Sequence, residues 1–223
     1  MISIVDISKN KEFLNKLLDR NQFEFDDVKE TVNDILVNVR LNKDKALKEY
    51  TKTFDGVDLE SFSVSEEEIN KALKNTSSEL KKDLIKAKRN IEKYHEKQLR
   101  TSYSLYEEED IILGQIVRPI EKAGIYVPGG SAAYPSTVLM NVVPAKIAGV
   151  KKVVMITPPD NKGKIKDSIL AAASIAGVDE IYKVGGAQGI AALTFGTESI
   201  PKVDKITGPG NIYVAMANKQ VMG

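Results

Sequence analysis

The stretch Ala123-Gly124-Ile125-Tyr126-Val127, followed at once by Pro128-Gly129-Gly130, decides the fold. It is a short apolar run that ends in a glycine turn, as expected for a strand buried on both faces of a sheet. Similar runs recur at residues 152–156, 180–184 and 203–206, and helical patterns follow the four runs at residues 137–148, 166–175, 187–193 and 212–221. Strands that alternate with helices at this spacing predict βαβ units and a parallel sheet with helices on both faces.

The first half of the chain has a different composition. Up to about residue 110 charged residues are dense and Gly56 is the only glycine. Apolar residues at helical spacing predict helices here, with a break near Asn42. Ser65 before three glutamates predicts a capping box, and Ser77 precedes a further amphipathic helix. Residues 103–118 predict a hairpin of two short strands around the acidic turn at residues 107–110.

The overall composition excludes several classes of protein. Hydrophobic residues make up 42% of the 223 residues, and the formal net charge is +1. We therefore expect no nucleic-acid partner. The N-terminus lacks the pattern of a signal peptide, and no apolar run reaches the roughly 18 residues of a membrane span. With no cysteine in the chain, disulfides and thiol catalysis are excluded and a cytoplasmic location is expected.

Histidine is scarce as well. His95 is the only one, and it falls late in a predicted amphipathic helix, where a surface or capping role is expected. A catalytic zinc site usually takes three protein ligands, often two or three of them histidines. We therefore expect no zinc site built from this chain alone.

The loops that follow the predicted strands carry the functional signal. In a parallel sheet they share the carboxyl edge, where ligands bind. The four loops cover residues 128–137, 157–163, 185–188 and 207–211, and three of them are rich in glycine and open a helix. Such loops allow the backbone to approach a ligand, and helix starts favour phosphate. Ser136 or Thr137 is expected to cap the first of these helices. The set indicates a nucleotide-sized site, although the fingerprint G-x-G-x-x-G is absent.

Three residues in or beside these loops are candidate ligand contacts. Tyr126 ends a strand, where a core aromatic is as plausible as a contact to a ligand. Asn211 fits a helix N-cap as well as a binding residue. Gln188 lies in a first helical turn, beside two glycines, and a ligand contact is slightly favoured. All three suit the orientation of a cofactor, and none is a strong acid, base or metal ligand.

Longer motifs resemble the histidinol dehydrogenase family. They lie at residues 124–130, 134–140, 184–188, 195–198 and 201–211, in the same order and spacing, with a looser match through residues 39–40 and 50–55. The resemblance implies oxidation of L-histidinol through histidinal to L-histidine by a homodimer that uses NAD and zinc. It also carries the family's NAD-contacting tyrosine, glutamine and asparagine onto Tyr126, Gln188 and Asn211.

The resemblance further implies an α/β fold with two related, incomplete Rossmann-like domains. Residues 123–223 would form the Rossmann-like, NAD-facing domain with its parallel sheet. Residues 1–122, the mainly helical region with a short β-hairpin, would be part of a discontinuous domain. The family's zinc ligands, its acid/base glutamate and histidine, and most substrate contacts lie beyond residue 223. We therefore expect a catalytically incomplete N-terminal fragment, with no catalytic and no metal-binding residue of its own.

Two other functions stay open at this point. The chain could be a standalone nucleotide- or NAD-binding domain without catalysis, which the single histidine favours for the isolated chain. It could also be an interaction protein whose helical region only mediates assembly.

Overall fold

The computed structural model describes residues 5–7, 10–18, 25–108, 110–129 and 133–222. Three parts of the sequence-based predictions lie outside these residues. They are the first four residues of the N-terminus, Glu109 in the acidic turn, and residues 130–132 of the first glycine-rich loop.

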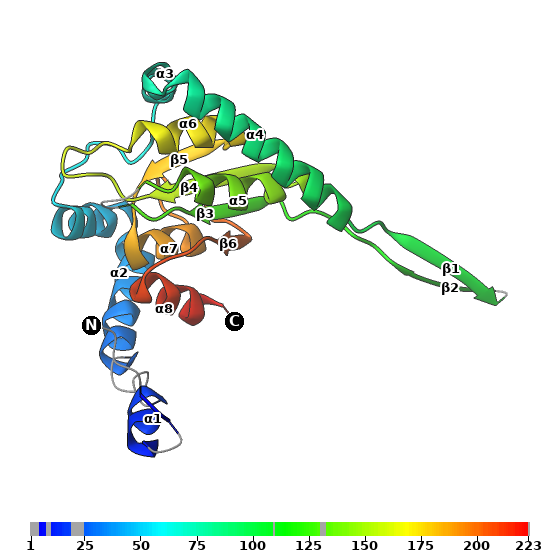
Figure 1. Ribbon diagram of the computed structural model, residues 1–223, viewed down its shortest axis with the longest axis horizontal. Helices are drawn as coiled ribbons and strands as arrows, with labels where there is room; N and C mark the ends of the chain where they lie inside the picture. The colour runs from blue at the N-terminus through cyan, green and yellow to red at the C-terminus, as the bar shows by residue number, and fades with distance from the viewer. Residues whose placement is uncertain (1–4, 8–9, 19–24, 109, 130–132, 223) are drawn as a thin grey trace.

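A four-stranded parallel sheet forms the centre of the molecule (Figure 1). Its strands are β3 (Lys122–Tyr126), β4 (Lys152–Thr157), β5 (Glu180–Lys183) and β6 (Lys205–Thr207). Each strand overlaps one of the four predicted apolar runs, so the predicted parallel sheet is confirmed. The strand order is β5-β4-β3-β6. The chain therefore moves outward from β3 through β4 to β5 and then returns to the other side of β3, which makes the crevice between β3 and β6 a topological switch point.

Helices cover both faces of the sheet, as predicted. One face carries α5 (Pro135–Ile147) and α6 (Asp167–Ala176), and the other carries α7 (Gly186–Phe195) and α8 (Ile212–Val221) (Figure 1). Successive strand residues point to opposite faces. Ile125 and Met155 therefore join the core on the α5–α6 side, and Tyr126 and Ile156 join the core on the α7–α8 side.

Much of the helical first region packs against the helices of the sheet domain, while its first helix stands apart (Figure 1). Its elements are α1 (Lys11–Leu18), α2 (Phe25–Tyr50), the π-helical η2 (Thr51–Asp55), α3 (Glu66–Asn75), α4 (Ser78–His95) and the short η3 (Glu96–Gln98). Helix α2 packs on α7 and α8, while α3 and α4 pack on α5 and α6. The predicted break near Asn42 is found at Lys43, whose φ of 46° and ψ of −125° interrupt α2.

Local signals placed two helix starts correctly and one incorrectly. Ser65 forms the predicted capping box with Glu68, and the Ser77 side chain accepts from the backbone N–H of Leu80. The prediction that Ser136 or Thr137 caps α5 is wrong. The N-cap is Tyr134 and the helix begins at Pro135, because proline has no N–H to satisfy and its fixed φ suits the first helical position.

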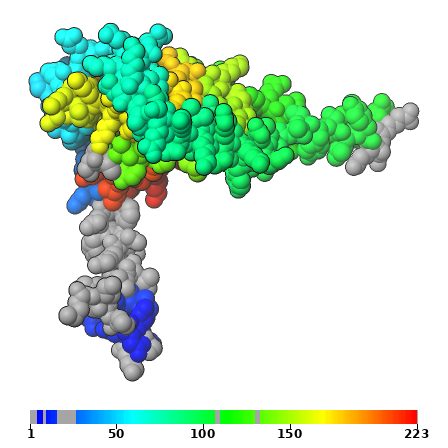
Figure 2. Space-filling model, turned by 45° about the horizontal axis from the view of Figure 1, so that its top comes forward, coloured from blue at the N-terminus to red at the C-terminus, as the bar shows by residue number. Residues whose placement is uncertain are grey.

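The predicted hairpin is confirmed and stands away from the rest of the molecule (Figures 1 and 2). Strands β1 (Tyr103–Glu108) and β2 (Ile111–Gln115) pair antiparallel, with a register shift between Tyr106 and Glu108. Every side chain of β2 is exposed. In the part of the chain that the structure describes, no helix has the length and apolar character that crossing a membrane requires.

Candidate functional site

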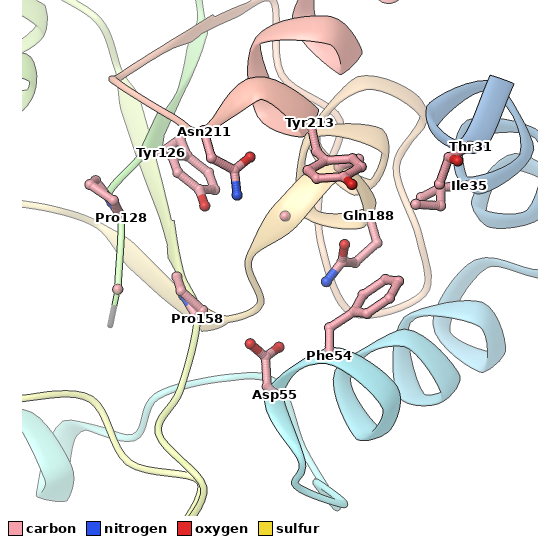
Figure 3. A pocket seen from close by; sticks show the side chains of 13 residues that line it. Thr31, Ile35, Phe54, Asp55, Tyr126, Pro128, Pro158, Gln188, Asn211 and Tyr213 are labelled. Atoms are coloured by element: carbon pink, nitrogen blue, oxygen red, sulfur yellow. The ribbon is translucent and has the colours of Figure 1, made fainter. Parts of the chain in front are cut away.

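A cavity of about 540 Å³ opens at the carboxyl edge of the sheet, at the switch point between β3 and β6. The loops after all four strands contribute to it, and α2 and η2 form the opposite wall (Figure 3). Its lining residues are Thr31, Ile35, Phe54, Asp55, Tyr126, Pro128, Gly129, Pro158, Gly186, Ala187, Gln188, Asn211 and Tyr213. The three candidate residues from the sequence are therefore brought together in one cavity.

Tyr126 lies at the end of β3, only 4% exposed. Its ring packs with the core on the α7–α8 side, and its hydroxyl faces the cavity (Figure 3). Burial raises the pKa of this phenol, although a hydrogen bond from the backbone of Gly186 acts in the opposite direction, and the nearby charge of Asp55 raises the pKa further. The hydroxyl is therefore protonated at neutral pH and available as a donor. Tyr126 is thus a core aromatic whose hydroxyl reaches the cavity, and its contact to a ligand stays a prediction.

Gln188 projects from the first turn of α7 and is 2% exposed. Its position depends on Gly186, which has a φ of 60°. A Cβ on Gly186 would meet the Gln188 side-chain oxygen at less than contact distance. The glycine at the helix start thus makes room for the amide, whose nitrogen faces Asp55 and Phe54 across the cavity (Figure 3).

Asn211 caps helix α8. Its Oδ1 accepts a hydrogen bond of 3.0 Å from the backbone N–H of Val214. The capping bond occupies the oxygen, and the side-chain nitrogen points toward the centre of the cavity (Figure 3). The N-cap interpretation is therefore correct, and it leaves the amide N–H groups to meet a ligand.

Asp55 is a charged residue of this cavity that the sequence analysis did not single out. It ends η2, directly before Gly56, whose φ of 70° turns the chain. Its Oδ2 is buried and has no hydrogen-bond partner among the residues that the structure describes, and burial raises its pKa from 3.8 to about 6. At neutral pH the cavity wall therefore contains an ionised carboxylate.

Other contributors from the first region also escaped the sequence analysis. Phe54, Thr31 and Ile35 line the cavity because α2 packs on α7 and α8. The segment 50–55 was noted as part of a motif, so a signal existed. The periodicity of α2 shows which face is apolar, and it does not show which helices that face meets.

A smaller cavity of about 270 Å³ adjoins the first one. The two share Pro128, Gly129 and Pro158, and the second extends along the loop after β4. Together they extend along the carboxyl edge, so an elongated ligand has room on both sides of Pro158.

Metal-binding groups do not gather in the described part of the chain. No three histidine, cysteine or acidic side chains there lie close enough to hold an ion. His95 lies at the end of α4, with its Nδ1 2.6 Å from the Gln98 side-chain oxygen. The described residues thus offer no ligand set for zinc, and the expectation that this chain alone binds none stays a prediction.

The fold and the cavity together define a class. This is an α/β protein with a Rossmann-like parallel sheet, and its ligand-sized cavity lies at the switch point and is bordered by glycine-rich loops. The family model described as histidinol dehydrogenase matches residues 18–223. The chain therefore belongs to the histidinol dehydrogenase family.

Individual relatives agree with this assignment. The chain is 58% identical to histidinol dehydrogenase from Bacillus cereus over 196 residues, covering 88% of this chain and 46% of the relative. It is 54% identical to the Clostridium acetobutylicum protein of the same name, covering 96% and 49%. The crystal structure of histidinol dehydrogenase from Elizabethkingia anophelis superimposes with a TM-score of 0.87 at 41% identity, covering 97% of this chain and 49% of that one. The chain spans about half the length of the relatives it matches.

Proposed function

We propose that this chain is the NAD-binding half of an enzyme that oxidises L-histidinol through histidinal to L-histidine. One observation supports this assignment above the others. In a chain of the histidinol dehydrogenase family, Tyr126, Gln188 and Asn211 converge on one cavity at the switch point of a parallel sheet. We further propose that the whole protein is a cytoplasmic homodimer, as the resemblance implies.

The cavity suits a dinucleotide in shape and in chemistry. Dinucleotides bind at the switch point of Rossmann-like sheets, with phosphates near helix starts. Here Gly129 and Gly186 bring backbone close to the cavity, and α7 begins at Gly186. The Tyr126 hydroxyl and the amides of Gln188 and Asn211 supply hydrogen-bond donors around it. Pro128, Pro158 and Phe54 add apolar surface against which flat rings can pack.

NAD, when bound, supplies the acceptor for a hydride. The residues of this chain bind and orient the nucleotide. Removal of the hydroxyl proton from the alcohol needs a general base, worth ~10²–10⁴-fold in rate. Tyr126, Gln188 and Asn211 are poor candidates for that base at neutral pH. The Tyr126 phenol has a raised pKa, and Gln188 and Asn211 end in neutral amides that do not take up a proton at this pH.

The described residues offer no ligand set for zinc. We propose that the acid/base groups, the zinc ligands and most substrate contacts lie in the other half of the protein, as the resemblance to the family implies.

A standalone NAD-binding domain without catalysis is the second candidate. The cavity favours it for the chain in isolation, because the lining of the cavity contains no histidine. Both candidates use the same nucleotide site. They differ in whether adding the other half of the protein creates turnover.

Two measurements on the 223-residue chain test the proposal. The fluorescence of NADH should change on binding, and Tyr126→Phe should weaken binding by roughly 2- to 10-fold through loss of one hydrogen bond. Tyr106→Phe, which alters an exposed tyrosine of the hairpin, is the matched control and should bind like the parent chain.

Turnover is measured as NADH formation at 340 nm with histidinol and NAD⁺. The chain alone should give no turnover. Mixing it with the part of the Bacillus cereus relative that this chain does not match should restore some activity. Absence of NADH binding would refute the nucleotide site. Turnover by the chain alone on the order of 1–10 s⁻¹ would show that the catalytic groups are in this half. Failure of complementation despite NADH binding would favour the non-catalytic domain.

A further inference from the structure

We propose that Glu198 is a positioning residue for the nucleotide cavity, because it holds the part of α2 and η2 that carries Phe54 and Asp55. This inference rests on the proposed function, since it gives a role in the same site to a residue outside the cavity. Glu198 lies in the loop between α7 and β6 and is not among the residues that line the cavity. Its role is therefore indirect, through the segment that it holds.

A sharp bend divides α2 into two limbs. Lys43, with a φ of 46° and a ψ of −125°, separates a first limb at residues 25–42 from a second limb at residues 44–55, which includes η2. A lysine rarely adopts this backbone conformation, and such a conformation persists only where surrounding contacts fix it. Both limbs line the cavity, the first through Thr31 and the second through Phe54 (Figure 3). The bend therefore sets the shape of this wall.

Contacts from the loop after α7 fix the bend on both sides. Beyond the bend, the Asp44 backbone N–H donates to the Glu198 Oε2 at 3.0 Å, and the Ser199 hydroxyl donates to the Asp44 carboxylate at 2.5 Å. Before the bend, the Arg40 guanidinium lies 5.5 Å from the centre of the Phe195 ring. The first N–H groups of a helical segment lack partners within it, and an acidic side chain there also interacts favourably with the helix dipole. Glu198 thus serves as the N-cap of the second limb, across a separation of 154 residues.

The second limb connects this cap to the cavity wall. Near the middle of the limb, the Tyr50 hydroxyl accepts a hydrogen bond of 2.9 Å from the Asn38 side-chain nitrogen of the first limb. The Tyr50 ring also stacks on Phe54, with 5.6 Å between the ring centres and 5° between the ring planes. The limb is therefore held at its start by Glu198 and at its middle by Asn38. When the cap is lost, the start of the limb can shift, and Phe54 shifts with it.

The test is a titration of NADH by its own fluorescence, which is measured without interference because the chain contains no tryptophan. Glu198 is exposed, so its removal opens no cavity in the core. Glu198→Ala should weaken NADH binding by about 3- to 10-fold, since the binding-competent placement of the second limb becomes a smaller fraction of the population. Glu198→Gln keeps an oxygen that can accept from the Asp44 N–H, and its affinity should stay within about 2-fold of that of the parent chain.

A double substitution shows whether the effect passes through the second limb. In a chain that already carries Phe54→Ala, adding Glu198→Ala should weaken NADH binding further by less than about 2-fold, because changes that act through the same contact are not additive. The matched control is Glu121→Ala. It removes an exposed glutamate that pairs with Lys151 at 3.6 Å and does not line the cavity, so it should bind NADH like the parent chain.

A thermal melt of every variant distinguishes a loss of stability from a loss of position. A lower melting temperature of Glu198→Ala with unchanged NADH affinity would overturn the inference and leave the nucleotide site standing. Equal losses of affinity with and without Phe54 would also overturn it. If Glu198→Ala does not fold, Glu198→Ser, whose side chain is too short to reach Asp44, is titrated in its place. If the parent chain binds no NADH, the inference and the proposed nucleotide site are both overturned.

Discussion

Replacing Asp55 by asparagine should stabilise the free protein at neutral pH. Burial raises the pKa of Asp55 from 3.8 to about 6, so the folded state binds a proton more tightly than the unfolded state. Between about pH 4 and pH 6 the unfolded chain therefore carries the smaller share of protonated Asp55, and stability falls as pH rises. Above pH 6 the full cost of the buried charge is present.

The size of the effect follows from the shift. A rise from 3.8 to about 6 corresponds to ~3 kcal/mol, at about 1.4 kcal/mol for each pKa unit. The carboxylate is only partly buried, and solvent screening reduces this figure to ~1–2 kcal/mol. Asparagine carries no charge, so Asp55→Asn should recover most of that amount at pH 7.5 and much less at pH 4.

Urea unfolding followed by circular dichroism at both pH values measures this difference. The control is Asp58→Asn, whose exposed side chain should change the free energy of unfolding by less than about 0.5 kcal/mol at either pH. The reasoning would be refuted if Asp55→Asn gave no gain at pH 7.5, or gave the same gain at pH 4. A confirmed gain, together with weaker NADH binding, would mean that the site retains an unpaired charge at the expense of stability.

Substitutions at three further positions test separate parts of the site and the fold. Asn211→Ala removes the cap of α8 and should cost ~1 kcal/mol in urea unfolding, whereas Asn211→Asp keeps a capping oxygen and should keep the stability while it weakens NADH binding through loss of the amide donor. Gly208→Ala should destabilise the chain by ~1–3 kcal/mol and weaken NADH binding, since Gly208 has a φ of 128° and a Cβ there would collide with the Tyr126 carbonyl; an unchanged melting temperature would contradict this. Ser65→Ala removes the capping box of α3 and should cost ~1 kcal/mol, with unchanged NADH affinity because Ser65 does not line the cavity.

Much of the fold could be read from local patterns. The four apolar runs became strands because parallel strands covered on both faces must be apolar throughout. Ile125 and Tyr126 are both buried although they point to opposite faces. The helix α8 begins and ends where the pattern predicted. Apolar runs and helical spacing determine these features, and both are visible in the sequence.

The features that could not be predicted depend on packing between distant elements. The strand order β5-β4-β3-β6 cannot be predicted from the sequence of any single segment. Asp55 belongs to the site because α2 packs on α7 and α8 and thereby brings η2 over the sheet edge. The predicted cap of α5 is wrong for a local reason. Ser136 and Thr137 are typical capping residues, but the helix begins before them, at Pro135. The division into residues 1–122 and 123–223 stays a proposal.

The two sides of the cavity come from opposite ends of the chain. Thr31 and Asp55 lie on one wall and Asn211 on another, and the Gln220 side chain donates to the Lys29 carbonyl at 3.0 Å across a separation of 191 residues. A ribosome releases the N-terminal residues first, at about 5–20 residues per second. During synthesis, α2 therefore cannot complete its side of the cavity until α8 has emerged from the ribosome. Nascent chains arrested before Asn211 should lack NADH binding, and binding should appear only once the whole of α8 has left the exit tunnel.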